Sequence, residues 1–400
     1  MAQAGIKATS GRKAARSARA VLDPGAVATR GLAPECYVSP DFYALEVERV
    51  LAREWLCIGR VEDVAAPGDY TSVDILGEPL VMLRDQGGQL RVFSRVCRHR
   101  AMILVEGRGN ARRFVCPYHA WTYGLDGRLV SAPLADRAPG FDRAGCVLPA
   151  PRVEPWEGFV FVNFDSGAEP LAPRLAGLAR YFAKWRLDDM VTVRSYDFEV
   201  GWNWKVMCEN FIEAYHHIGA HRLSLEPVLP TRLVRVEKSD GPYAIVHMGH
   251  RARKGDPGAG AGEESWAKLP AIAALSEEER RRSSLVHVFP AHLISIEADR
   301  MEYYLVNPLG PERLRIRKVF CVPRATLDRP EFGPAIDALT GRYLKYRVED
   351  VTINDSLMRS VRSRYAEAAR LTPLERPLHE FRRYLDRLTK VSPTRATGRA

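Results

Sequence analysis

The sequence predicts an α+β protein in which a small all-β domain precedes a larger domain, built from an antiparallel sheet flanked by helices. Two observations lead to this prediction. Between residues 57 and 164, short alternating apolar and polar stretches are separated by Gly, Pro and Asp turns, as in small antiparallel β domains. From residue 174 onward, stretches with helical spacing of apolar residues surround stretches with the two-residue period of strands.

Three regions are expected along the 400 residues: a disordered basic leader at 1–35, an N-terminal helix with the β domain at 36–165, and a second folded domain at 166–400. The leader carries five basic residues before its first acid, Asp23, which is half of the net charge of +10. It lacks the apolar segment of a secretory signal. The chain has no run of eighteen apolar residues and no nucleic-acid-binding motif, so we expect no transmembrane helix and no nucleic-acid partner.

The first domain begins with an expected helix at 40–56, and Ser39 fits its N-cap position. Strands are expected at 70–76, 79–84, 90–96 and 158–164, and a linker at 165–173. In the second domain we expect helices at 174–187, 204–218, 330–347 and 375–388, and strands at 192–200, 242–250, 285–307 and 312–323. Residues 251–283 are rich in Gly and charged residues, which predicts either a solvated insert or a flexible cover over a channel, with a slight preference for the insert.

Four residues of the β domain form a paired metal-binding pattern: Cys97 and His99 in C-R-H, then Cys116 and His119 in C-P-Y-H. Two thiolates and two imidazoles are the ligands of a Rieske [2Fe–2S] cluster, in which two Cys hold one iron and two His hold the other. The same residue types also bind structural zinc. Zinc hairpins more often begin with C-x2-C or C-x4-C, and the flanking strand-like stretches place this motif on loops between strands. The pattern therefore favours the iron–sulfur cluster and predicts that the chain handles electrons.

A second group of metal-binding side chains lies in the helical stretch of the second domain and comprises Glu213, His216, His217 and His221. A helix with buried histidines would explain the group without a metal. Two imidazoles and one carboxylate, however, form the facial triad of non-haem Fe(II) oxygenases, which leaves positions open for O2 and water. The spacing leaves open which two histidines bind. His217 and His221 share a helical face, whereas His216 converges with His221 only if the helix unwinds, for which Gly219 offers a site.

With both motifs present, residues 35 to about 390 resemble the large (alpha) subunit of a Rieske non-haem iron oxygenase of the aromatic-ring-hydroxylating family. The family motif has an acid, two residues, a His, four residues and a second His. It matches Glu213, His216 and His221, and it implies that the two histidines bind a mononuclear Fe(II) beside the Rieske [2Fe–2S] cluster. The resemblance also implies a Rieske domain followed by a catalytic domain.

The resemblance places the third iron ligand in a Glu–Asp segment on a late helix, where Asp350 matches best and Glu349 and Asp355 compete. It gives Glu213 the role of an electron bridge between the iron-ligand His and a Rieske His of a neighbouring subunit. Many family members have Asp at this position, and Glu is similar to the branch that oxidises quaternary ammonium compounds such as choline, betaine and carnitine. Four aromatic residues could cage a cation or equally belong to the core: Trp202, Phe289, Tyr303 and Tyr304.

The implied activity is that of a terminal oxygenase, which takes electrons through the Rieske cluster and uses O2 at Fe(II) to hydroxylate a small organic substrate. We favour monooxygenation and N-demethylation of a methylated amine. Alternatives are cis-dihydroxylation or hydroxylation of an aromatic compound, and a Rieske electron carrier without oxygenase activity. Expected partners are a flavin and NAD(P)H reductase or a ferredoxin, and further copies of the chain in a homotrimer. The other cysteines lack paired spacing and are expected to be free thiols in a reducing cytoplasm: Cys36, Cys57, Cys146, Cys208 and Cys321.

Overall fold

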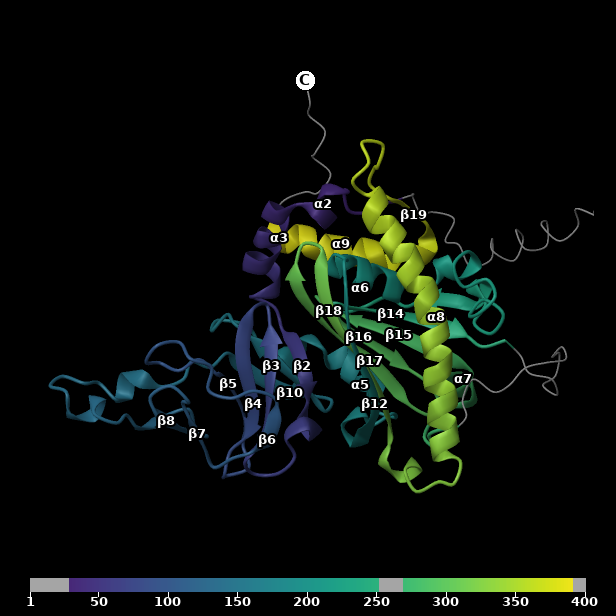
Figure 1. Cartoon of the computed structure of the whole chain (residues 1–400). Helices are drawn as coiled ribbons and strands as arrows, with labels where there is room; N and C mark the ends of the chain where they lie inside the picture. The colour runs from purple at the N-terminus through teal and green to yellow at the C-terminus, as the bar shows by residue number, and fades with distance from the viewer. Residues whose placement is uncertain (1–28, 252–268, 391–400) are drawn as a thin grey trace, which may run out of the picture.

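The computed structural model describes residues 29–251 and 269–390, and it has the α+β architecture that the sequence predicts. Small antiparallel sheets form the N-terminal part, and one large antiparallel sheet flanked by helices forms the rest (Figure 1). The expected leader at 1–35 lies outside the described residues as far as residue 28.

The segment at 251–283, for which the sequence predicts an insert or a cover, is described only in part. Its Gly-rich portion lies outside the described residues. Beyond that portion, Leu269 and Leu275 are buried, and the side chain of Ser276 caps the first turn of helix α7 (Glu277–Arg280). The described end of the segment therefore belongs to the folded domain.

The N-terminal segment folds as a helical stretch. Its elements in chain order are β1 (Thr29–Arg30), α2 (Glu35–Val38), α3 (Pro40–Glu46) and the π-helical turn η1 (Val47–Leu51). The Ser39 hydroxyl accepts a hydrogen bond from the Phe42 amide at 3.2 Å, which confirms Ser39 as the N-cap of α3. The predicted end of this helix at residue 56 is wrong, because the chain leaves η1 at Leu51 and becomes a strand at Leu56.

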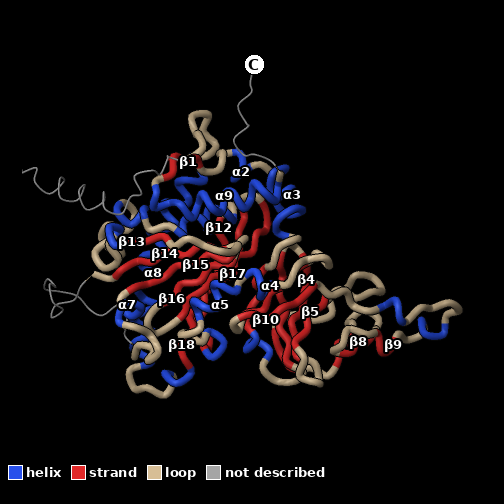
Figure 2. The backbone as a smooth tube through the Cα atoms, turned by 180° about the vertical axis from the view of Figure 1, so that it is seen from behind, coloured by secondary structure: helices blue, strands red, loops and turns tan. Residues whose placement is uncertain are grey.

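The small β domain contains three antiparallel sheets, with strand orders β10-β11-β2, β5-β4-β3-β6 and β7-β8-β9. Their bounds are β2 (Leu56–Arg60), β3 (Asp69–Ile75), β4 (Glu78–Arg84), β5 (Leu90–Ser94), β6 (Arg108–Asn110), β7 (Arg113–Val115), β8 (Thr122–Gly124), β9 (Leu129–Ser131), β10 (Arg152–Trp156) and β11 (Phe159–Asn163). The strands predicted for this domain correspond to β3, β4, β5 and β11, with small shifts at their ends. In both views the β7-β8-β9 sheet projects away from the large sheet (Figures 1 and 2).

The second domain is built on a seven-stranded antiparallel sheet with the order β12-β18-β17-β16-β15-β14-β13. Its strands are β12 (Met190–Val200), β13 (Val234–Val236), β14 (Tyr243–Gly249), β15 (Arg282–Val288), β16 (His292–Ile296), β17 (Met301–Gly310) and β18 (Arg313–Pro323). The single strand predicted at 285–307 is wrong, because two turns divide it into β15, β16 and β17. Pro290 marks the first turn and should have divided the predicted strand there, whereas the second turn, at 297–300, contains neither glycine nor proline.

Helices of this domain depart from the prediction at their ends. They are α4 (Leu171–Arg174), α5 (Ala176–Phe182), α6 (Trp204–Ile212), α8 (Phe332–Ser360) and α9 (Arg376–Thr389). The predicted linker at 165–173 already includes the first turn of α4, whose Leu171 is buried. The helix predicted at 330–347 continues for a further thirteen residues in α8. Most residues of this extension are polar or exposed, so the apolar spacing that predicts a helix fades before the helix ends.

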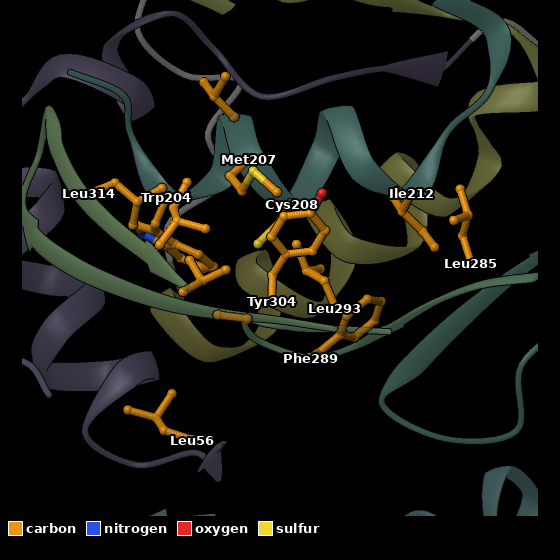
Figure 3. Packing of buried hydrophobic residues seen from close by; sticks show 14 of the residues in the cluster. Leu56, Trp204, Met207, Cys208, Ile212, Leu285, Phe289, Leu293, Tyr304 and Leu314 are labelled. Atoms are coloured by element: carbon orange, nitrogen blue, oxygen red, sulfur yellow. The ribbon is translucent and has the colours of Figure 1, made fainter. Parts of the chain in front are cut away.

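Helix α6 packs on the large sheet and forms the centre of the core. Trp204, Cys208 and Ile212 of α6 are completely buried and belong to one core cluster with the sheet residues Leu293 and Tyr304 (Figure 3). Burying a side chain of this size contributes about 1.5–3 kcal/mol. The packing therefore fixes the helix that leads directly into the predicted histidine motif.

A fully buried ion pair attaches α6 to the N-terminal segment. The Lys205 ammonium donates to the Glu46 carboxylate at 2.8 Å, and neither side chain is exposed to solvent. Burial raises the pKa of Glu46, whereas Lys205 opposes this shift. The pair therefore links α3 to α6 in a place where neither charge can be solvated.

Two expectations about the whole chain concern its cysteines and its apolar segments. All seven cysteines are described and none forms a disulfide, as expected for the five outside the metal-binding motif. Among residues 29–251 and 269–390, no helix combines the length and apolar character needed to cross a bilayer.

Replacing Lys205 by Met should lower the free energy of unfolding by about 3–5 kcal/mol, because it leaves Glu46 buried without a cation. Urea denaturation measures the loss. The double variant Glu46→Gln/Lys205→Met should recover part of it. As a control, Lys184→Met removes a half-exposed partner of Glu279 and should cost less than about 1 kcal/mol. A Lys205→Met protein as stable as the parent would contradict the structural role of the pair.

Candidate functional site

The four residues of the predicted Rieske motif lie on two similar loops, one between β5 and β6 and the other between β7 and β8 of the projecting sheet (Figure 1). Each loop closes with a hydrogen bond from an alanine amide to the carbonyl oxygen of its cysteine, at 3.1 Å for Ala101 to Cys97 and 3.0 Å for Ala120 to Cys116. Both alanines have positive φ, +54° and +60°, in the left-handed region that favours glycine. The backbone is thus bent sharply behind each cysteine.

These loops bring the cysteines together on the inside and the histidines together on the outside. Cys97 and Cys116 are each 2% exposed, while the rings of His99 and His119 are exposed and their centroids lie 4.6 Å apart. Within the described residues, the ligand atoms of three or more His, Cys, Asp or Glu side chains lie within 4.8 Å of one another at only one place, and that place is in the second domain. No three of the four residues of this motif have ligand atoms that close together. A tetrahedral zinc ion would draw all four donors closer than that. Two separate pairs suit a cluster with one iron held by Cys and one by His.

The second motif begins where Glu213 ends helix α6. Its Oε2 accepts hydrogen bonds from the amides of Tyr215 at 2.5 Å and His216 at 3.1 Å, and its Oε1 lies 2.5 Å from His216 Nδ1. A 3₁₀ turn, η6 (Tyr215–Ile218), follows. The predicted helix to residue 218 is therefore wrong, and the break comes before His216 instead of at Gly219. A carboxylate that binds backbone amides competes with the helix, and apolar spacing does not reveal such competition.

The change of direction brings His216 and His221 to one point, beside Asp350 of helix α8. The Nε2 atoms lie 3.7 Å (His216) and 3.0 Å (His221) from Asp350 Oδ1, and the three ligand atoms all lie within 4.8 Å of one another. Two imidazole nitrogens and one carboxylate oxygen on one side of a point are the donor set of a facial non-haem iron site. The structure thus brings together the three residues that the family motif implies.

Each of the two imidazoles is backed by a carboxylate at its other nitrogen. His216 Nδ1 faces Glu213, and His221 Nδ1 lies 2.6 Å from Glu349 Oε2, to which the Ser224 hydroxyl also donates. Such partners hold the proton on Nδ1 and leave the Nε2 lone pair free for a metal. Glu349, which competes with Asp350 in the sequence, therefore lies behind a histidine and not beside the ligand atoms.

The remaining candidates lie away from this point. Asp355 accepts a hydrogen bond from Trp202 Nε1 at 2.6 Å. His217 is buried, its Nδ1 is 3.4 Å from the carbonyl oxygen of Leu229, and burial lowers its pKa to about 3. His217 is therefore neutral at physiological pH and packs beside the two converging histidines.

A cavity of about 120 Å³ opens beside the three convergent residues, between helices α6 and α8 and the large sheet. Of the four aromatic residues considered for a cation cage, Trp202 and Tyr304 line this cavity, whereas Phe289 and Tyr303 pack elsewhere. The sheet also contributes charged residues that the motif analysis missed: Glu297, Arg300, Glu302 and Lys318. Charges within the otherwise apolar stretch 285–307 are the signal that could have revealed most of them.

Strand β8, which follows the loop with Cys116 and His119, lies far from helix α8, which carries Asp350, in both views of the backbone (Figures 1 and 2). A second hollow, of about 610 Å³, reaches Glu213 and His216 from the outer side of the domain. It is bordered by Leu357 and Tyr365, both of which are exposed. The Glu213 carboxylate therefore lies between the inner cavity and this outer hollow.

Comparison with known proteins places both halves of the chain. Residues 54–145 match the Rieske [2Fe–2S] domain, and residues 187–390 match the ring hydroxylating alpha subunit (catalytic domain). Over 188 residues the chain is 35% identical to the carnitine monooxygenase oxygenase subunit of Acinetobacter baumannii, which covers 46% of this chain and 51% of the relative. Over 236 residues it is 32% identical to the benzene 1,2-dioxygenase subunit alpha of Pseudomonas putida, which covers 57% and 52%.

The chain thus spans about half the length of the curated relatives it matches. A solved structure of a quaternary ammonium Rieske monooxygenase superposes with a TM-score of 0.77, at 23% identity, over 90% of this chain and 96% of the other, and this likeness concerns the fold. A Rieske domain followed by this catalytic domain implies a [2Fe–2S] cluster and a mononuclear iron, and the donor sets described above fit both groups. Since the catalytic-domain match alone covers about half of the chain, the protein belongs to the family of ring-hydroxylating alpha subunits that carry a Rieske [2Fe–2S] domain.

Proposed function

We propose that the protein is a terminal oxygenase that hydroxylates a small methylated amine with O2. The observation that carries this proposal is the convergence of His216, His221 and Asp350 in one cavity, in a chain that also carries the paired Cys and His loops. A pure electron carrier would need only the loops. We assign Cys97, His99, Cys116 and His119 to the cluster, and the three convergent residues to the mononuclear iron.

When bound, the two iron centres supply one-electron transfer and the activation of O2. The protein's own residues prepare these sites. Glu213 and Glu349 hold the Nδ1 protons of the two ligand histidines, so that both Nε2 atoms face the same point. Neutral His217 adds no charge beside them. The largely apolar walls of the cavity keep bulk water away from the reacting carbon atom.

A methylated amine is supported by the match to a carnitine monooxygenase subunit and by Glu213, which resembles the branch acting on quaternary ammonium compounds. Hydroxylation of an N-methyl group consumes O2, two electrons and two protons, and forms one water molecule. The N-hydroxymethyl product then breaks its C–N bond and releases formaldehyde. Hydroxylation or cis-dihydroxylation of an aromatic compound is the second candidate, favoured by the match to a benzene dioxygenase subunit.

We further propose a cytoplasmic homotrimer in which the exposed His99 and His119 of one copy enter the outer hollow of the next. The separation of the two sites within one chain supports this arrangement, since the loops of the same chain lie far from Glu213. Glu213 would then pass the electron between the copies. A flavin and NAD(P)H reductase or a ferredoxin would supply the electrons.

Turnover with NADH and a surrogate reductase on a panel of methylated amines and a panel of aromatic compounds tests the activity. We expect formaldehyde from at least one methylated amine, in an amount matching NADH consumed. Diols or phenols from the aromatic panel, without formaldehyde from the amines, would favour the second candidate.

Asp350→Ala should lower the iron content from about three to about two atoms per chain, because the mononuclear iron loses its only carboxylate ligand while the cluster keeps both of its irons. Iron analysis and the visible spectrum measure the two sites separately. Asp355→Ala removes an acid from the same helix that contacts Trp202, and it should keep about three iron atoms. Equal iron contents in the two variants would show that the third ligand lies elsewhere.

Glu213→Gln should leave the cluster spectrum intact but slow the reoxidation of the reduced cluster by the mononuclear site about 10–100-fold, because the carboxylate that orients His216 becomes neutral. Stopped-flow absorbance in a single turnover measures this rate. The matched variant Glu349→Gln changes the carboxylate behind His221, away from the outer hollow, and should weaken iron binding more than it slows electron transfer. A Glu213→Gln protein with the parent's rate would refute the bridge.

A further inference from the structure

A group of buried charged residues forms the wall that the large sheet contributes to the cavity. They lie at the turn between β16 and β17 and on neighbouring strands, and each is less than one-tenth exposed: Glu297, Asp299, Arg300, Glu302 and Lys318. All except Asp299 line the cavity. Charges in such a place are costly unless they are paired. The ion pairs within this group therefore show which of its charged side chains has no partner of opposite charge in the group and could pair with a ligand.

Both cations of this wall are already paired with carboxylates of the protein. Arg300 donates to Asp299 at 2.7 Å and to Glu302 at 2.8 Å, and Lys318 donates to Glu302 at 2.8 Å. Two positive and two negative charges cancel. Within the described residues, Glu297 is then the carboxylate of this wall to which no arginine or lysine donates a hydrogen bond.

Glu297 accepts hydrogen bonds from hydroxyl groups instead. Ser283 donates to its Oε2 at 2.6 Å and Ser295 to its Oε1 at 3.4 Å, while Nε2 of His250 lies 4.0 Å from Oε2. Burial raises the pKa of Glu297 to about 7. Near neutral pH this carboxyl group can therefore lose its proton when a positive charge enters the cavity beside it.

At two aromatic rings of the cavity, Tyr304 and Tyr343, the position of a cation is already taken. The Lys318 ammonium lies 4.1 Å from the ring centroid of Tyr304 and 5.5 Å from that of Tyr343. The protein's own cation thus takes the favourable position over these rings. A second cation in the cavity has to be balanced by a carboxylate.

We propose that Glu297 is the counter-charge for the cationic group of the substrate, so that the cavity selects molecules with a tertiary or quaternary ammonium group over molecules of the same shape that lack the ammonium charge. The inference rests on the proposed function, because it supplies the methylated amine with its charged partner. It also separates this cavity from one suited to an uncharged aromatic ring.

Binding of matched pairs to the anaerobic holoenzyme, measured by calorimetry, tests the proposal. Choline is paired with 3,3-dimethyl-1-butanol and glycine betaine with 3,3-dimethylbutanoate, in which carbon replaces the charged nitrogen. We expect the parent protein to bind the cation of at least one pair about tenfold or more tightly than its isostere. Glu297→Gln keeps the size of the side chain and its serine contacts, and should remove this preference while leaving the affinity for the isostere unchanged.

Glu157→Gln is the control, since Glu157 is another acid of raised pKa but lies in the β domain outside the cavity. It should bind both members of each pair like the parent protein. The melting temperature and the visible spectrum show that each variant is folded and carries its cluster. A parent protein without preference for the cation in either pair would overturn the proposal, as would a Glu297→Gln variant that binds cation and isostere with equal losses.

The number of protons released on binding tests the role of Glu297 independently. Since Glu297 is partly protonated near pH 7, binding of a cation to the parent protein should release protons, and affinity for the cation should fall as the pH drops below 7. The other titratable or charged groups that face Glu297 are His250, Asp299, Arg300, Glu302 and Lys318. They remain in Glu297→Gln, which should release none. Undiminished release from this variant would assign the effect to one of them and overturn the proposal.

Formaldehyde formation distinguishes the proposed role of Glu297 from the proposed reaction. Turnover of methylated amines without a preference for the cation over its isostere would refute the role of Glu297 and leave the proposed function intact. A preference for the cation that depends on Glu297, without formaldehyde from any bound amine, would refute the proposed reaction and leave the binding site intact.

Discussion

The hydrogen bonds of Glu213 determine how the chain leaves helix α6. One carboxylate oxygen accepts from two successive backbone amides, and these amides are then lost to the helix. Had the helix continued, His216 and His221 would point about 140° apart, because each residue turns an α-helix by about 100°. The other oxygen faces the His216 ring. One side chain thus sets both the path of the backbone and the orientation of a ligand, and the cavity beside them depends on this turn.

Sequence reasoning singled out the histidines that converge in the structure because they occur in a short motif with fixed spacing, and it singled out Asp350 through the family resemblance. It missed where α6 ends, since a carboxylate bound to backbone amides leaves no trace in apolar periodicity. The buried wall of the cavity was also missed. In the sequence Glu302 and Lys318 look like solvent-facing strand residues. Only the strand register, which places Tyr304 opposite Lys318 and Glu302 opposite Phe320, shows that both lie inside.

Buried ion pairs stabilise both helix α6 and the part of the large sheet that borders the cavity. Lys205 and Glu46 fasten α6 to the N-terminal helices, and Glu302 joins Arg300 and Lys318 on the sheet. Stability alone does not explain such groups, because apolar residues of equal volume are often as stable. The first pair joins helices that are distant in the sequence, and the second group joins the neighbouring strands β17 and β18. Each group lies next to the cavity or the helix that leads to it. We read them as positioning devices that keep the cavity in one shape.

The two cluster loops carry a comparable constraint in their backbone. Ala101 and Ala120 remain in the left-handed region, although a glycine there would avoid the strain of about 1 kcal/mol for each. Each loop is closed by a hydrogen bond over a buried cysteine, and alanine at the bend has fewer backbone conformations available than glycine would have. Electron transfer is fast when little surrounding structure must rearrange. The alanines thus restrict the backbone of both loops more than glycine would, which suits the proposed electron transfer, at a small loss of folding stability.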